Sequence, residues 1–249
     1  LEGLSPELRR QWLEGDWSVI SGRFFTSWNP AVHVVDPFDI PEEWLVLVGL
    51  DMGRGSHPSA AVWCAQDPDT GIVYVFDELV SYAVLEDFIE EFARKEDSHT
   101  SKLRAIYADP SMWVKAHERR DEVAPAVLFG MRYPILPANN DRVNGWRVLK
   151  MWMHWTETTP PGLYVFSNCH ELQRTIPLQQ YAHSRDGTKE DLDTRKEDDL
   201  VDALRYAVAS GFPLPSLVQR NQPAPREERR RAEKPPRLPE NVPEHALFY

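Results

Sequence analysis

The chain has 249 residues, a hydrophobic fraction of 42% and a formal net charge of -11 at pH 7. This length suits one globular domain with appendages, and the acidic balance argues against a protein that coats nucleic acid by electrostatics alone. The charge does not exclude a nuclease, because carboxylates that repel one another become favourable around a divalent cation.

No membrane or disulfide class fits the sequence. The longest apolar run, from Trp44 to Leu50, is far too short to span a bilayer, and no secretory signal pattern opens the chain. Cys64 and Cys169 are the two cysteines, so neither a disulfide framework nor a Cys-rich zinc site is expected. A reducing, intracellular compartment is the default expectation.

The first 28 residues predict a short helix followed by an aromatic connector. Ser5 and Pro6 have the residue types of an N-cap and a first helical position, and Gly15 is a stop signal. We therefore assign residues 1–28 to a linker helix and connector that precede the main domain.

Strand and helix patterns alternate between about Pro41 and Phe212, which predicts an α/β sheet with helices packed on it. The continuous apolar run 45–51 predicts a central strand covered on both faces. Segments 59–67 and 72–80 are joined by the turn sequence PDTG, where Gly71 can adopt a positive φ, so an antiparallel hairpin is expected.

The remaining elements follow in chain order. An amphipathic helix is expected over 83–95, a strand over 103–109, a short extended segment over 131–137 and a helix over 142–155. A short strand over 162–167, a helix over 171–181 that includes Pro177, a hairpin over 181–194 and a helix over 198–211 complete the domain, which we assign to 29–212. Pro and Arg dominate from Pro213 onward, which predicts a disordered tail over 213–249.

Acidic residues stand at three of these element ends. Asp51 ends the strand 45–51, Asp109 ends the strand 103–109, and the last helix begins with Asp198, Asp199 and Asp202. Carboxylate oxygens at strand ends and a helix start can bind Mg²⁺ or Mn²⁺, which indicates phosphodiester chemistry. Helical spacing pairs Asp202 with either Asp199 or Asp198, since residues three or four apart share a face.

Each acid also has an ordinary structural explanation when taken alone. Asp51 and Asp109 could simply end a strand or form a turn, and acids at a helix start favour capping and the helix dipole. Asp202 lies one turn inside a helix with a buried face, so its carboxylate needs a partner. The conjunction of the three positions favours a shared metal site.

The order of elements is that of the RNase H-like fold, and the motifs resemble the nuclease domain of the phage terminase large subunit. The resemblance rests on LEGDWSVISGRFF, GLDMG, YADPS, ILPANNDRVNGWRVL and KEDDLVDALRYAV, in this order and spacing. It implies an RNase H-like mixed sheet flanked by helices in which the acids converge.

The resemblance also implies roles for the acids. Asp51 and Asp109 correspond to the first two carboxylates of the family, and the third falls within DDLVDAL, on Asp199 and Asp202. Asp199 stands where some relatives carry His, and the adjacent Asp198 is an alternative ligand. Candidate phosphate contacts are Arg54, Lys115, Arg142, Arg147, Lys189, Arg195 and Lys196.

The function that the resemblance implies is metal-dependent endonuclease cleavage of double-stranded DNA during viral genome packaging. Two Mg²⁺ or Mn²⁺ ions about 3.5–4 Å apart would flank the scissile phosphate. No GxxxxGK[ST] motif is present, so the ATPase domain of the family is not expected in this chain. Implied partners are double-stranded DNA, the ATPase domain, the portal and the small terminase subunit, in the cytoplasm of an infected bacterial host, with no membrane.

Two alternatives stay open from the residues. One is another RNase H-like nuclease, such as a Holliday-junction resolvase. The other is a non-catalytic DNA or portal docking module in which the acids serve no chemistry.

Overall fold

The structure is a computed structural model that describes residues 23–53, 56–114, 123–184, 187–193 and 197–213. The expected helix near Pro6 and most of the Pro/Arg-rich tail lie outside these residues. No helix in the described ranges is long and apolar enough to cross a membrane.

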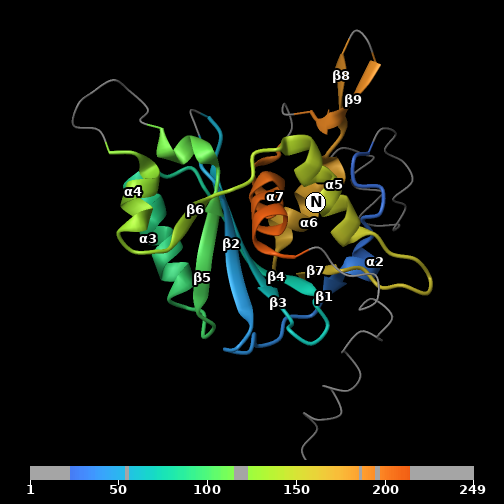
Figure 1. The fold of residues 1–249 in the computed structure, drawn as a ribbon, viewed down its shortest axis with the longest axis horizontal. Helices are drawn as coiled ribbons and strands as arrows, with labels where there is room; N and C mark the ends of the chain where they lie inside the picture. Colours follow the sequence, from blue (N-terminus) through green and yellow to red (C-terminus); the bar gives the residue numbers. More distant parts are fainter. Residues whose placement is uncertain (1–22, 54–55, 115–122, 185–186, 194–196, 214–249) are drawn as a thin grey trace, which may run out of the picture.

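A seven-stranded mixed sheet forms the centre of the molecule, with strand order β1-β7-β4-β3-β2-β5-β6 (Figure 1). Only β3 runs antiparallel to its neighbours, and the other adjacent strands of this sheet are parallel. Its strands are β1 (Val34–Val35), β2 (Leu45–Asp51), β3 (Ser59–Gln66), β4 (Val73–Ser81), β5 (Leu103–Ala108), β6 (Ile135–Pro137) and β7 (Leu163–Phe166).

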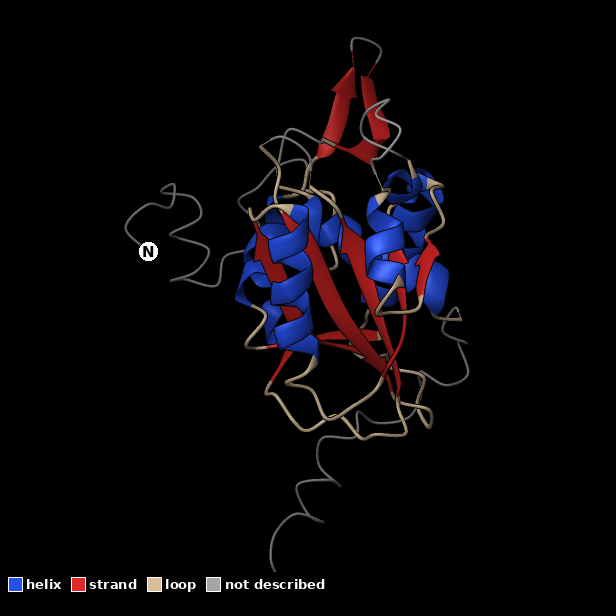
Figure 2. Ribbon diagram, turned by 90° about the vertical axis from the view of Figure 1, so that its left-hand side faces the viewer, coloured by secondary structure: helices blue, strands red, loops and turns tan. Residues whose placement is uncertain are grey.

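Helices cover both faces of this sheet, which completes an RNase H-like α/β architecture. Figure 1 places α3 and α4 on one side and α5, α6 and α7 on the other. A separate two-stranded hairpin, β8 (Tyr181–Ser184) and β9 (Gly187–Leu192), projects from the body in both ribbon views (Figure 2). The helices are α2 (Pro30–His33), α3 (Leu85–Glu96), α4 (Pro125–Gly130), α5 (Arg142–Met153), α6 (His170–Thr175) and α7 (Asp199–Gly211), with 3-10 turns η1 (Pro110–Trp113) and η2 (Ile176–Leu178).

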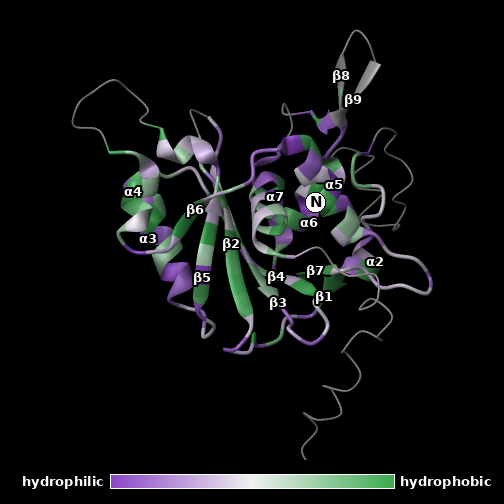
Figure 3. Cartoon of the chain, in the orientation of Figure 1, coloured by the Kyte–Doolittle hydropathy of each residue, from purple (hydrophilic) through white to green (hydrophobic). Residues whose placement is uncertain are grey.

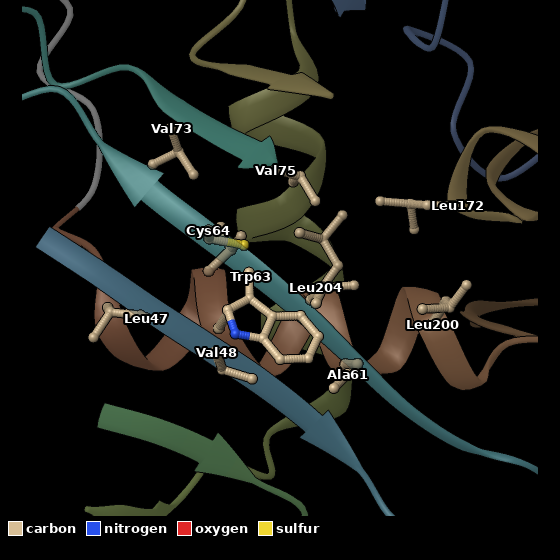
Figure 4. Close-up of a cluster of buried hydrophobic side chains, with 14 of the residues drawn as sticks. Leu47, Val48, Ala61, Trp63, Cys64, Val73, Val75, Leu172, Leu200 and Leu204 are labelled. Carbon is tan, nitrogen blue, oxygen red and sulfur yellow. The ribbon is translucent and has the colours of Figure 1, made fainter. Parts of the chain in front are cut away.

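The late helix α7 lies directly on β2 because β2 has a glycine at the crossing point. A Cβ on Gly49 would lie 1.8 Å from the carbonyl oxygen of Ala203, so only glycine admits the helix at this distance. Leu47 and Cys64 from the sheet and Leu204 from α7 belong to the buried cluster at this crossing (Figure 4). The close packing fixes the start of α7 over the ends of β2 and β5.

The opposite face of the sheet is closed by aromatic packing under α3. Phe92 stacks on Trp63 of β3 at a ring separation of 4.9 Å, and Phe129 of α4 lies edge-on to Phe92 at 5.5 Å. Coloured by hydropathy, β2 is apolar along its length while α3 carries polar residues (Figure 3). A strand covered on both faces is what the continuous apolar run of β2 predicts.

Most of the expected elements are present, including the hairpin β3–β4 with Gly71 at φ 70°. The expected helix over 171–181 is wrong in its second half. Helix α6 ends at Thr175, and Ile176–Leu178 form a 3-10 turn. Pro177 lacks the N–H that an α-helix needs, so the chain leaves the helix there and enters β8 at Tyr181.

The connector before α2 packs into the core. Phe24, Phe25 and Trp28 are each at most 2% exposed, and the Phe24 amide donates to the carbonyl of Gln179 at 2.8 Å. The aromatic side chains of this connector therefore contribute to the same core as the sheet.

Candidate active site

Two of the predicted acids lie side by side at one edge of the sheet. Asp51 is the last residue of β2, and Asp109 follows the neighbouring parallel strand β5, where Leu50 pairs with Ala108. The amide of Asp109 donates to the carbonyl of Leu50 at 3.0 Å. Because the carboxyl ends of parallel strands share an edge, the two acids are adjacent.

Helix α7 brings the remaining acids to the same edge, and their charges shift the pKa of Asp51. Burial raises the pKa of Asp51 well above its ordinary value, and the negative charges of four other acids raise it further: Asp202, Asp109, Asp199 and Asp198. Within the described residues no hydrogen bond reaches the Asp51 carboxylate. Among the described residues, therefore, no donor compensates the charged form of Asp51.

Asp109 is held by two donors from different elements. Its Oδ1 accepts from the amide of Ser111 at 2.6 Å, and its Oδ2 accepts from the hydroxyl of Tyr206 on α7 at 3.1 Å. Burial and neighbouring acids raise the pKa of Tyr206, so the phenol stays a donor. Both contacts fix the orientation of the Asp109 carboxylate.

Asp202 is buried between two guanidinium groups. Its Oδ1 accepts from Arg205 Nε at 2.8 Å and Nη2 at 2.5 Å, and its Oδ2 accepts from Arg142 Nη1 at 3.1 Å. These are the partners that a carboxylate one turn inside a helix needs. One is on α7 itself and the other begins α5.

Asp198 and Asp199 differ in their surroundings. Asp198 precedes α7 but its side chain makes no capping hydrogen bond. Instead its Oδ2 accepts from Arg142 Nη2 at 3.2 Å, and burial followed by the Asp202 charge raises its pKa to about 6. Asp199 Oδ1 lies 3.6 Å from Nδ1 of the exposed His57, and burial raises its pKa. Asp198 is therefore not a simple helix cap.

The donor set suits a hard divalent cation, since it consists of carboxylate oxygens, and one of them, on Asp51, accepts no hydrogen bond from the part of the chain that the structure describes. The described residues nevertheless contain no group of three His, Cys, Asp or Glu side chains already close enough to hold a metal ion. Arg142 engages Asp198 and Asp202 together, which draws those two carboxylates toward the guanidinium.

The predicted phosphate contacts are distributed unevenly. Arg142 is engaged by carboxylates, whereas Arg147 is exposed on α5. Lys189 is part of β9. Four of the seven, namely Arg54, Lys115, Arg195 and Lys196, lie outside the described residues.

Three contributors to the site were not predicted: Arg205, Tyr206 and His57. Arg205 and Tyr206 follow Asp202 by three and four residues, so helical spacing alone could have suggested that they share its face. Gly53 lies two residues after Asp51, in the loop that follows β2. A Cβ there would lie 2.2 Å from the carbonyl oxygen of His57, so the loop backbone itself needs glycine.

The solved structures to which this chain is similar include large terminases and large terminase nuclease domains of phages. The P22 large terminase nuclease domain shares 19% identity at a TM-score of 0.58, covering 76% of this chain and 92% of that one. A large terminase from a thermophilic bacteriophage, solved in complex with ATP-gamma-S, gives 17% identity, a TM-score of 0.63, and coverages of 84% and 54%. The large terminase nuclease of the thermophilic phage G20c with bound cobalt shares 16% identity at a TM-score of 0.51, covering 76% of this chain and 97% of that one.

These likenesses show that the chain has the fold of the terminase nuclease domains. The chain spans about half the length of the large terminase solved with ATP-gamma-S, 54% of it. No protein-family model matches the sequence, and no curated protein matches it significantly.

Proposed function

We propose that this chain is the nuclease domain of a phage terminase large subunit and that it cleaves double-stranded DNA by metal-dependent phosphodiester hydrolysis. The observation that carries the proposal is the convergence of Asp51, Asp109 and the acids of α7 at one sheet edge, on the fold of the terminase nuclease domains. Carboxylates that raise the pKa of a buried neighbour this strongly are typical of a site that works with a bound cation.

Mg²⁺ or Mn²⁺ is the proposed cofactor, in a two-metal arrangement. The G20c nuclease was solved with bound cobalt, which supports a divalent ion on this fold. Bound between the acids, two such ions would stabilise the charge that develops on the attacking and leaving oxygens of the phosphate. Asp51 would face both ions, Asp109 one of them, and Asp202 with Asp199 the other.

The protein residues position these ligands. Tyr206 and the Ser111 amide orient the Asp109 carboxylate, and Arg205 fixes one oxygen of Asp202 from inside the protein. Asp199 is favoured over Asp198 as the partner of Asp202 because the negative charge of Asp199 raises the pKa of Asp51 more than that of Asp198 does. Helix α7 rests on Gly49, so these groups keep a fixed distance from β2.

The wider role we propose is cleavage of viral DNA during genome packaging. This chain covers 54% of the large terminase solved in complex with ATP-gamma-S, so about half of that protein lies outside the similar region. This supports an ATPase domain as a partner of the nuclease. The portal, the small terminase subunit and double-stranded DNA complete the proposed assembly, in the host cytoplasm.

A plasmid-nicking assay tests the proposal. Wild type should convert supercoiled plasmid with Mg²⁺ or Mn²⁺ and should be inactive with EDTA. Asp51→Asn should lose cleavage while its circular dichroism spectrum stays that of wild type, since the proposal places this carboxylate between the two cations. Metal-independent cutting, or unchanged cutting by Asp51→Asn, would refute the metal mechanism, and preferential cutting of four-way junctions would favour a resolvase.

A further inference from the structure

Arg142 joins three acids that come from two parts of the chain, the strand β9 and the start of α7. It is the first residue of α5, and it donates from Nε to Asp191 of β9 at 2.8 Å, from Nη1 to Asp202 at 3.1 Å and from Nη2 to Asp198 at 3.2 Å. Its side chain is 28% exposed. The guanidinium therefore closes the acidic cluster from its solvent side.

Arg205 approaches the same cluster from the interior and uses the other oxygen of Asp202. It is 1% exposed, packs against the rings of Trp146 and Tyr206, and donates to Oδ1 of Asp202 with both Nε and Nη2. Because the side chain of Arg205 is buried and packed between these rings, its guanidinium is held in place and Oδ1 of Asp202 stays occupied. Oδ2, which Arg142 uses, is the oxygen of Asp202 that can exchange partners.

A cation bound by Asp202 must compete with Arg142 for that oxygen. Both are positive, both need the lone pairs of Oδ2, and two like charges on one carboxylate oxygen repel each other. Arg142 also pairs with Asp191. Asp191 is not among the acids whose charges raise the pKa of Asp51, so it lies outside the proposed metal ligands. The guanidinium can thus leave Asp202 and Asp198 while Asp191 keeps its Nε.

We propose that Arg142 is a displaceable counter-ion of the active site. It neutralises Asp198 and Asp202 when no metal is bound, and it leaves Oδ2 of Asp202 when a divalent cation binds there. Arg142 is a positioning residue in this role and sets the affinity of the site for metal. The inference rests on the proposed metal-dependent function of the same acids.

Mn²⁺ binding to the full chain, followed by calorimetry and by the electron paramagnetic resonance signal of free Mn²⁺, tests this role. Arg142→Gln removes the competitor, and we expect Mn²⁺ to bind about tenfold more tightly, because a positive charge no longer occupies Oδ2 of Asp202. The matched control is Arg132→Gln, since Arg132 pairs with the exposed Asp97 at 3.3 Å, away from these acids. Its Mn²⁺ affinity should equal that of wild type.

Arg142→Lys tests whether the hydrogen bonds of the guanidinium to the three acids, or only its positive charge, compete with the metal. Lysine keeps the charge but cannot donate to three carboxylates in one plane, so the Mn²⁺ affinity of this variant should lie between wild type and Arg142→Gln. An affinity equal to wild type would mean that charge alone matters and would overturn the displacement.

Thermal unfolding supplies the second readout. In EDTA, Arg142→Gln should melt at a lower temperature than wild type, because Asp198, Asp202 and Asp191 lose their counter-ion, and saturating Mn²⁺ should raise its melting temperature more than that of wild type. A folded Arg142→Gln variant with unchanged or weaker Mn²⁺ affinity would overturn the role of Arg142. Wild type that binds no Mn²⁺ at all would instead overturn the proposed function.

Discussion

At the residue scale, the third acidic position of the site is shared by two neighbours with different surroundings. Asp199 acts more strongly on Asp51 than Asp198 does, and it faces His57 rather than Arg142. We expect Asp199→Asn to reduce plasmid cleavage about 100-fold and Asp198→Asn about tenfold or less, because loss of a ligand costs more than a change in its surroundings.

Cleavage rates at saturating Mg²⁺ for both variants would decide between these two acids. Asp69→Asn is a suitable control, since Asp69 lies in the turn between β3 and β4, far along β3 from this sheet edge. A larger loss with Asp198→Asn than with Asp199→Asn would reverse the assignment.

The acids themselves could be predicted from their places at element ends, but their partners could not. An apolar run that stops at Asp51 or Asp109 marks a strand end in one dimension. Arg142 lies 60 residues from Asp202 along the chain, and nothing in the local pattern distinguishes a guanidinium that binds phosphate from one that binds carboxylates. That difference arises only when α5 and α7 pack together.

At the element scale, the end of α3 is tied to β4 by an ion cluster that should make the stability depend on pH. His99 Nε2 lies 2.8 Å from Asp77 Oδ2, and Lys95 Nζ lies 2.8 Å from Asp77 Oδ1. Burial lowers the pKa of His99, but the hydrogen bonds and negative charges of Asp77 and Glu96 have the larger combined effect. The pKa of His99 therefore lies above its ordinary value. Burial raises the pKa of Asp77, but His99 and Lys95 outweigh it and the pKa lies below its ordinary value.

The two shifts define the pH range in which this pair stabilises the fold. The contribution of His99 is complete below its unfolded pKa of about 6.5 and is lost as the pH rises through the higher folded pKa. The contribution of Asp77 is present above about pH 3.9 and is lost as the pH falls through the lower folded pKa.

Replacement of His99 should therefore matter more in mild acid than in base. We expect His99→Gln to lower the free energy of unfolding by about 1.5–3 kcal/mol at pH 6, the range for hydrogen bonds to charged groups, and by clearly less at pH 9. Urea denaturation at the two pH values measures this. An equal loss at both would show that the neutral ring contributes through packing against Phe76 and Trp63 rather than through its charge.

A helix or strand could be predicted where the spacing of its apolar residues agreed with the positions of Gly and Pro. It could not be predicted where the two signals conflicted. The apolar run of β2 and the spacing of Phe88 and Phe92 in α3 each indicate a single type of element. The segment 171–181 has helical spacing but contains Pro177, and the missing N–H ends the helix at Thr175. The two-residue strand β1 and the single turn α2 are too short to leave a periodic pattern.

At the scale of the whole molecule, the net charge of -11 should make DNA binding depend on the proposed metal. Five aspartates gather where the phosphate would lie: Asp51, Asp109, Asp198, Asp199 and Asp202. Their repulsion opposes DNA until a divalent cation reverses the local charge.

We expect a fluorescently labelled duplex of about 20 base pairs to bind at least about tenfold more tightly in Ca²⁺ than in EDTA at matched ionic strength, because Ca²⁺ takes the same oxygen ligands. Fluorescence anisotropy measures the affinity. Asp51→Asn with Asp109→Asn removes two of the ligands, so Ca²⁺ should then have little effect. A duplex that binds wild type equally well in EDTA would mean that cations elsewhere on the chain hold the DNA, and that the acidic edge contributes to cleavage but not to binding.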